Sequence, residues 1–245
     1  MEIANKSKEL FSIKGWVKNS FCDWEGEIST VIFLPGCNFR CPFCQNWDLA
    51  TNPDSFASLD WETIKKSIAA EKDFIDGVVI TGGEPFMSKN LENLLKEIKE
   101  IDLKVKIDTN GSFPEKLEKV LSKGLIDSIS MDIKNSLNLK DYGKTIGGTN
   151  EKILDNVKNS INIIKSSGID YEFRTTLLPV FHSLSRVKEI GEYLNRAKRY
   201  ILQGYRSIGV NPQFTCSETF SKEQLETFKK EIEGFFDECR IRYYK

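Results

Sequence analysis

Short apolar runs rich in β-branched residues alternate along the chain with stretches in which apolar residues recur every three or four positions. The short runs are typical of buried strands, and the recurring pattern predicts amphipathic helices. The predicted strands span residues 30–34, 77–81, 105–108, 128–133, 171–177 and 200–202.

Four helices separate or follow these strands, and each presents one apolar face. The first two faces consist of Leu91, Leu94, Leu95 and Ile98, and of Ile153, Val157, Ile161 and Ile164. The third consists of Val187, Ile190 and Leu194. The last helix opens with a capping box from Ser221 to Gln224, and we expect it to bury Leu225, Phe228, Ile232, Phe235 and Phe236.

This alternation predicts an α/β fold with parallel strands and right-handed crossovers. About six βα units are too few for a closed eight-unit barrel, so a partial (β/α)6 TIM barrel is the favoured interpretation. A doubly wound sheet remains the alternative. We expect one domain over residues 1–245: an N-terminal flap (1–28) with an antiparallel strand, a barrel core (29–210), and a C-terminal helix and extension (211–245) with a short strand at 240–244.

Composition narrows the range of partners. Among the 245 residues 40% are hydrophobic and 29% charged, and the net charge of −1 lacks the basic excess of a nucleic-acid binder or a polybasic membrane anchor. No apolar run reaches the length of a transmembrane helix, and the N-terminus lacks the apolar core of a signal peptide. We therefore expect a cytoplasmic protein that binds neither nucleic acid nor membrane.

Three of the six cysteines, Cys37, Cys41 and Cys44, fall within eight residues directly after the first predicted strand. Such clustering indicates metal binding rather than disulfides. Thiolates suit both iron–sulfur clusters and zinc. Three thiolates can hold a 4Fe–4S cubane with one open iron, whereas a closed zinc site needs a fourth ligand, from Cys22 or from a partner.

Polar motifs stand at the ends of the following strands. They are Thr81-Gly82-Gly83-Glu84-Pro85, Asp108-Thr109-Asn110-Gly111, Met131-Asp132-Ile133-Lys134 and, inside an apolar strand, Arg174. Carboxyl ends of parallel strands meet at one edge of a barrel, where ligands bind. A structural interpretation is open for each motif: an ordinary βα turn, an Asn-Gly loop, an Asp132–Lys134 pair at the rim, or a salt bridge of Arg174.

The cysteine spacing C-x3-C-x2-C, with Phe43 before the third cysteine, resembles the radical S-adenosylmethionine (SAM) superfamily. Together with TGGEP, DTNG and MDIK, from about residue 14 to residue 202, the chain resembles the activating enzymes of glycyl radical enzymes. The resemblance implies one 4Fe–4S cluster, whose open iron binds SAM and whose electron cleaves it. The radical then derives from SAM, so no catalytic side chain is expected.

The resemblance also assigns roles to individual residues. Phe43 and Gln45 would line the adenine side of SAM, and Gly82, Gly83 and Glu84 its methionine side. The further SAM contacts would be Asn110, Asp132, Lys134 and Gln203, with Gln203 near the place of a histidine in relatives. Arg174 is a candidate from its place in an apolar strand, where it would pair with the carboxylate of SAM or of a barrel aspartate. Asp108, Thr109 and Asp132 would match a monovalent-cation site of this family.

The implied reaction is hydrogen abstraction from a glycine of a glycyl radical enzyme, such as anaerobic ribonucleotide reductase, with flavodoxin or ferredoxin as electron donor. An open cubane is oxygen-labile, which favours anaerobic life. The alternatives are a radical SAM enzyme that acts on a small molecule, like 7-carboxy-7-deazaguanine synthase, and a non-enzymatic zinc or iron–sulfur scaffold. We expect His182 to lie on the surface and assign no role to Cys22, Cys216 or Cys239.

Overall fold

The computed structural model describes residues 11–148, 150–216 and 218–243. Its strands form one eight-stranded sheet whose order follows the chain. They are β1 (Gly15–Ser20), β2 (Ser29–Leu34), β3 (Gly77–Gly82), β4 (Lys104–Thr109), β5 (Ser128–Asp132), β6 (Asp170–Leu177), β7 (Ala197–Gly204) and β8 (Phe236–Arg242). β1 is antiparallel to β2, whereas the pairs β2–β3, β3–β4, β6–β7 and β7–β8 are parallel.

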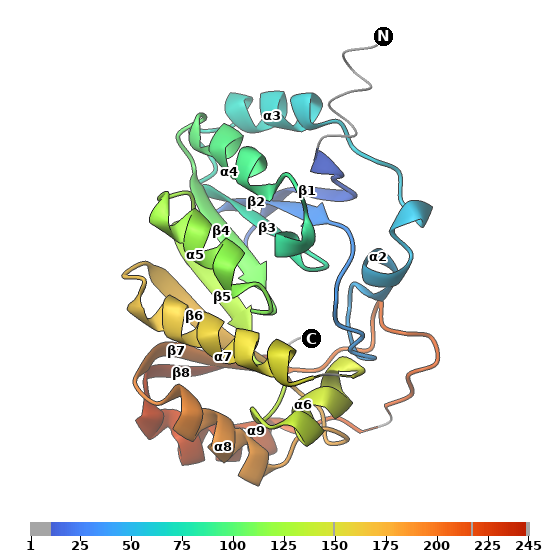
Figure 1. Cartoon of the computed structure of the whole chain (residues 1–245), viewed down its shortest axis with the longest axis vertical. Helices are drawn as coiled ribbons and strands as arrows, with labels where there is room; N and C mark the ends of the chain where they lie inside the picture. Colours follow the sequence, from blue (N-terminus) through green and yellow to red (C-terminus); the bar gives the residue numbers. More distant parts are fainter. Residues whose placement is uncertain (1–10, 149, 217, 244–245) are drawn as a thin grey trace. The chain divides into compact units, whose positions relative to one another are not determined.

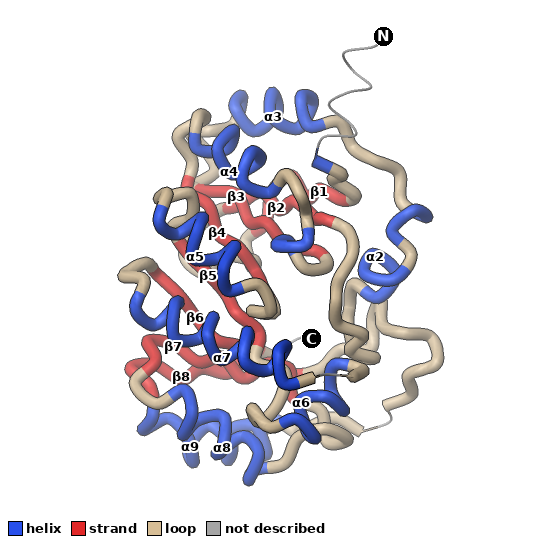
Figure 2. Tube along the Cα trace, in the orientation of Figure 1, coloured by secondary structure: helices blue, strands red, loops and turns tan. Residues whose placement is uncertain are grey.

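Helices occupy most of the connections between parallel strands (Figures 1 and 2). They are α2 (Trp47–Thr51), α3 (Trp61–Ala70), α4 (Leu91–Lys99), α5 (Pro114–Ser122), α6 (Leu139–Ile146), α7 (Glu151–Ser166), α8 (Leu184–Leu194) and α9 (Lys222–Ile232). Single 3-10 turns lie at Pro53–Ser55, Pro85–Met87 and Glu233–Phe235. None of the described helices combines the length and apolar character needed to cross a lipid bilayer.

This architecture confirms the predicted α/β class with a mainly parallel sheet and is consistent with a partial barrel. A doubly wound sheet reverses its strand order at a switch point, and the sequential order found here does not. The predicted antiparallel strand of the flap is β1. The predicted C-terminal strand is β8, which starts at Phe236 rather than at 240, and Tyr244 lies outside the described residues.

The chain forms two compact units. The first contains the described residues through Asn38, together with Asp48–Thr109 and Glu115–Ile129, and the second contains Phe39–Trp47, Asn110–Pro114 and the described residues from Ser130 onward. In the first unit the predicted face of α4 is fully buried, and in the second unit so is that of α8. On α7, Val157, Ile161 and Ile164 are buried, while Ile153 is half-buried.

The C-terminal helix differs from the prediction at its end. The capping box of Ser221 and Gln224 is present, and Leu225, Phe228 and Ile232 are buried as expected. The helix stops at Ile232, however, and Phe235 and Phe236 are only half-buried. Gly234, a poor helix former, lies in the turn that follows, and Phe236 is already the first residue of β8. Assigning Phe236 to the helix was therefore wrong.

Candidate functional site

In the first unit, the glycine-rich turn after β3 is fastened to the chain just before Cys37. Gly83 N–H donates to the Leu34 carbonyl at 2.8 Å, and Glu84 N–H donates to the Gly36 carbonyl at 2.8 Å. A Cβ atom on Gly83 would lie 1.8 Å from the Gly36 oxygen, so only glycine fits there. The structure thus brings the TGGEP motif against the start of the cysteine segment.

Glu84 is turned into the protein and is 1% exposed. Its Oε1 accepts hydrogen bonds from the Phe86 N–H at 3.1 Å and from the Thr109 hydroxyl at 2.9 Å. A buried carboxylate needs such donors to offset its lost hydration. Glu84 therefore joins the turn after β3 to the last residue of β4.

Asp108, near the end of β4, has a basic neighbour that the sequence analysis did not single out. The Lys106 ammonium lies 3.8 Å from Asp108 Oδ1, and its side chain is 3% exposed. It also donates to the Asp23 carbonyl at 2.6 Å, while the Thr81 hydroxyl donates to Asp108 at 3.3 Å. The signal for Lys106 was present, because a lysine in the apolar run Val-Lys-Ile needs a buried partner.

In the second unit, Asp132, Lys134 and Arg174 form an ionic cluster: Asp132 is the last residue of β5, Lys134 follows it by two residues, and Arg174 is buried inside β6. Lys134 Nζ lies 2.9 Å from Asp132 Oδ2, and Arg174 Nε lies 2.9 Å from Asp132 Oδ1. Burial alone would raise the pKa of Asp132, but the two cations overcome it and lower that pKa to about 2. The cluster is therefore ionised at neutral pH, with two positive charges and one negative charge.

This cluster continues along the same face of β6. Glu172 precedes Arg174 by two residues, accepts from the Ser130 hydroxyl at 2.7 Å and lies 3.9 Å from the Arg174 guanidinium. Two residues beyond Arg174, the Thr176 hydroxyl donates to Gln203 Oε1 at 3.4 Å. The structure thus places the predicted contact Gln203 on the same row, and it adds the buried Glu172, which the sequence analysis missed.

Cys41 and Cys44 belong to the second unit and Cys37 to the first, and none of the three forms a disulfide. Burial raises the pKa of the Cys44 thiol, and the positive charge of Lys134 counteracts that rise. Burial alone would lower the pKa of Lys134, but Asp132 and Cys41 raise it, so this ammonium stays charged.

No three His, Cys, Asp or Glu side chains surround one point where a single metal ion could bind, within the part of the chain that the structure describes. A cubane does not require this, since its thiolates bind different irons.

Several contacts within the second unit hold the segment from Phe39 to Trp47. Arg40 N–H donates to the Ile146 carbonyl at the end of α6, at 2.8 Å. The ring of Phe43 lies 5.5 Å from that of Phe181. The exposed Gln45 donates to the Arg206 carbonyl at 3.4 Å. Two main-chain bonds, from Trp47 to Gly209 and from Asn211 to Pro42, add the loop after β7.

Two other predicted residues have local roles. Asn110 Oδ1 accepts from the Ser112 N–H at 2.9 Å and from its hydroxyl at 2.6 Å, as in an Asx-type turn. His182 was expected on the surface, but it is 2% exposed, so that expectation was wrong. Its imidazole contacts the main chain that follows β5: Nε2 lies 2.9 Å from the Lys134 carbonyl oxygen. A loop residue without apolar periodicity gives no sequence signal of such burial.

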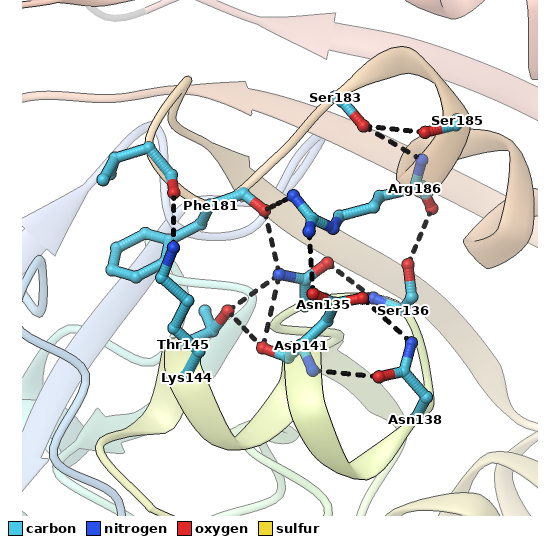
Figure 3. Close-up of polar contacts among 11 residues, drawn as sticks. Asn135, Ser136, Asn138, Asp141, Lys144, Thr145, Phe181, Ser183, Ser185 and Arg186 are labelled. Atoms are coloured by element: carbon cyan, nitrogen blue, oxygen red, sulfur yellow. Dashed lines mark hydrogen bonds and ion pairs between the residues drawn. The ribbon is translucent and has the colours of Figure 1, made fainter.

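A polar network anchors the residues that follow Lys134 (Figure 3). Asn135 Nδ2 donates to the Thr145 hydroxyl at 2.8 Å and to the Phe181 carbonyl at 3.1 Å. The Arg186 guanidinium donates to the same Phe181 carbonyl at 3.1 Å and to Asp141 at 2.8 Å. The end of β5 is thereby tied to α6 and to the start of α8. Sequence reasoning did not identify this network, because its members share no spacing pattern.

The chain is similar in sequence to several curated proteins. A protein of Methanocaldococcus jannaschii, provisionally named as a glycyl-radical enzyme activating enzyme, is 29% identical over 94% of this chain and 95% of its own. The pyruvate formate-lyase-activating enzyme of Clostridium pasteurianum is 25% identical over 83% of this chain and 86% of its own. The 7-carboxy-7-deazaguanine synthase of Hyperthermus butylicus is 36% identical, over only 36% of this chain and 37% of its own.

Among solved structures, Streptococcus suis SuiB matches with a TM-score of 0.66 and 16% identity. The match covers 86% of this chain and 47% of SuiB, and it supports the fold alone. The sequence profile of the radical SAM superfamily matches residues 31–194, which include the cysteine segment, the three strand-end motifs and Arg174. The chain therefore belongs to the radical SAM superfamily.

Proposed function

We propose that this radical SAM enzyme activates a glycyl radical enzyme. The observation that carries the proposal is the similarity to activating enzymes over 94% and 83% of the chain, with nearly the whole length of both relatives included. In the proposed reaction, a hydrogen atom passes from the α-carbon of a glycine in the partner protein to the SAM-derived radical. The products are 5′-deoxyadenosine, methionine and a partner that carries a glycyl radical.

The superfamily implies a 4Fe–4S cluster and SAM, and the donor set fits both. Cys37, Cys41 and Cys44 lie within eight residues and form no disulfide, and the Lys134 ammonium favours the thiolate form of Cys44. When bound and reduced, the cluster supplies the electron that cleaves SAM to methionine and a 5′-deoxyadenosyl radical. We assign the three cysteines as its ligands, which leaves one iron for SAM.

Asp132, Lys134 and Arg174 suit a zwitterionic ligand. Their summed charge of +1 favours a carboxylate, and Asp132 accepts from both cations, which holds them in place. We propose that Lys134 and Arg174 contact SAM, with Gln203 further along the same row of side chains. Phe43, Gln45 and Asn110, together with the Gly82–Glu84 turn, complete the proposed contacts. The buried Glu84 carboxylate faces Thr109, so in this turn the main chain is the better candidate for a direct contact.

A monovalent cation at Asp108, Thr109 and Asp132 is a further part of the proposal. The carboxylate and hydroxyl oxygens are suitable ligands. The Lys106 ammonium at 3.8 Å already supplies positive charge to Asp108, and it would compete with a cation for this carboxylate. Titrating Na⁺ and K⁺ into the reconstituted enzyme and measuring SAM cleavage tests the site.

The proposed partners are a glycyl radical enzyme as protein substrate and a flavodoxin or ferredoxin as electron donor. An open cubane is oxygen-labile, so we infer an anaerobic cytoplasm as the setting. The decisive experiment is anaerobic reconstitution, followed by incubation with SAM, dithionite and a candidate glycyl radical enzyme such as anaerobic ribonucleotide reductase. We expect a glycyl signal by electron paramagnetic resonance and an equal amount of 5′-deoxyadenosine.

A radical SAM enzyme that acts on a small molecule is the second candidate. The observation in its favour is the 36% identity to a 7-carboxy-7-deazaguanine synthase, over 93 residues. The two candidates differ in the fate of the hydrogen. With the partner's glycine deuterated, activation transfers deuterium into 5′-deoxyadenosine. Deuterium-free 5′-deoxyadenosine, without a glycyl signal from any candidate partner, would favour the small-molecule reaction.

A further inference from the structure

The single histidine of the chain is buried where the loop after β6 meets the end of β5. Its Nδ1 lies 3.1 Å from the Leu178 main-chain nitrogen and 3.3 Å from the Leu178 carbonyl oxygen, and its Nε2 lies 2.9 Å from the Lys134 carbonyl oxygen. The proposed reaction needs no histidine as acid or base. Burying a polar imidazole costs free energy, so we looked for the role of the contacts that offset this cost.

Only one of the two neutral tautomers satisfies both of the shorter contacts, at 3.1 Å and 2.9 Å. In that tautomer Nδ1 is unprotonated and accepts from the Leu178 N–H. The Lys134 carbonyl is an acceptor, so Nε2 must donate. The opposite tautomer would keep only the longer contact of Nδ1 with the Leu178 carbonyl, and it would set an unprotonated Nε2 against the Lys134 carbonyl oxygen. Burial, outweighing the two carbonyl groups, lowers the pKa of His182 to about 4, so the ring is neutral at physiological pH.

Three hydrogen bonds hold the main chain directly after β5, and His182 donates one of them. Ile133 N–H donates to the Arg174 carbonyl at 2.8 Å, and the Thr175 hydroxyl donates to the Ile133 carbonyl at 2.7 Å. Nε2 of His182 then holds the next carbonyl, that of Lys134. With its main chain held, the Lys134 side chain reaches Asp132 at 2.9 Å and lies where its charge acts on Cys41 and Cys44.

We propose that His182 is a positioning residue of the SAM site: its Nε2–H holds the Lys134 main chain, and thereby sets the direction of the Lys134 ammonium toward SAM. The proposal rests on the proposed contact between Lys134 and SAM. It is independent of the partner protein, since it concerns SAM binding rather than hydrogen abstraction. An absent glycyl radical would therefore leave this test intact.

Two substitutions separate the contacts of the ring. His182→Gln places an amide N–H near the position of Nε2 and keeps a donor for the Lys134 carbonyl. His182→Asn places an amide oxygen near the position of Nδ1 and keeps an acceptor for the Leu178 N–H, but it does not reach Lys134. Both variants lose ring volume, so their thermal stabilities should be similar and lower than that of the wild type.

The test is SAM binding to the reconstituted, oxidised proteins by anaerobic calorimetry. We expect His182→Asn to raise the Kd for SAM about tenfold and His182→Gln to change it less than about threefold. In a Lys134→Met background, His182→Asn should have no further effect, because the residue acts through Lys134. Equal Kd values for the two variants, or an unchanged effect of His182→Asn in the Lys134→Met background, would overturn the proposal.

A second measurement needs neither cluster nor SAM. Because the chain has one histidine, ¹⁵N-histidine labelling gives one imidazole in the nuclear magnetic resonance spectrum of the apoprotein. We expect a neutral ring with its proton on Nε2. A proton on Nδ1 would leave no donor for the Lys134 carbonyl, and that result would overturn the proposal.

Discussion

At the scale of single residues, Asp132 and Asp170 show what burial adds to similar ion pairs. Each carboxylate accepts from one lysine and one arginine. Among the cations that contact Asp132, Arg174 is 9% exposed. Among those that contact Asp170, Lys198 is 46% exposed. A buried cation that loses its partner keeps its desolvation cost, while an exposed cation returns to water.

From this difference we predict that Asp132→Asn lowers the free energy of unfolding of the apoprotein by about 2–3 kcal/mol. The matched control Asp170→Asn should cost less than about 1 kcal/mol. Urea denaturation at pH 7 compares the two variants. Equal losses would mean that Asp132 is as well solvated as Asp170.

The buried His182 predicts a pH dependence of stability. Its pKa is about 4 in the folded protein, whereas the unfolded chain has the ordinary value of 6.5, so the unfolded chain binds the proton first as the pH falls. This contribution to stability is complete above pH 6.5 and is lost as the pH falls toward 4. Among the neighbouring charges, Arg186 also disfavours protonation and does not titrate in this range.

We therefore expect the wild-type protein to lose about 2 kcal/mol more than His182→Gln between pH 7 and pH 5. Urea denaturation at both pH values gives the four free energies, and carboxylates common to both proteins cancel in the difference. The explanation fails if both proteins lose the same amount.

The sequence supplied the identities in the ionic cluster but not all of its contacts. Asp132, Lys134 and Arg174 were detectable because charges inside apolar strands need partners. The burial of His182 and the direction of the Glu84 carboxylate depend on where loops fold back. No local pattern encodes that, so these two features required the structure.

At the scale of elements, the strands were the most predictable part of the fold. A strand buried on both faces reads as a continuous apolar run, as in Val78–Val79–Ile80 within β3. The end of α9 was less predictable, because Phe235 and Phe236 extend the apolar pattern of the helix beyond Gly234. The pairing of β8 with β7, a contact distant in sequence, decides where the helix stops.

The turn after β3 yields a prediction at this scale. A methyl group on Gly83 would overlap the Gly36 carbonyl, next to Cys37, whereas Gly234 has ordinary backbone angles and open space around its Cβ position. Gly83→Ala should lower stability by about 3 kcal/mol and reduce the iron bound after reconstitution. Gly234→Ala should leave both nearly unchanged. Thermal unfolding and iron analysis would contradict this explanation if Gly83→Ala behaved like its control.

At the scale of the whole molecule, the six cysteines fall into two groups. Three lie in the segment 37–44, while Cys22, Cys216 and Cys239 are scattered along the chain. Burial raises the pKa of the Cys239 thiol to about 12, which makes it a poor ligand. One cluster per chain is therefore the proposed content, with none of the scattered cysteines involved.

Iron and sulfide analysis after anaerobic reconstitution tests this content. The wild type and a variant with Cys22, Cys216 and Cys239 all changed to alanine should each bind about four irons per chain. Changing Cys41 alone to alanine should remove most of the iron, because two thiolates cannot hold a cubane whose fourth iron has no protein ligand. If the triple variant loses the iron instead, one of the scattered cysteines is a ligand. That result would favour the zinc or scaffold interpretation, in which Cys22 is the fourth ligand.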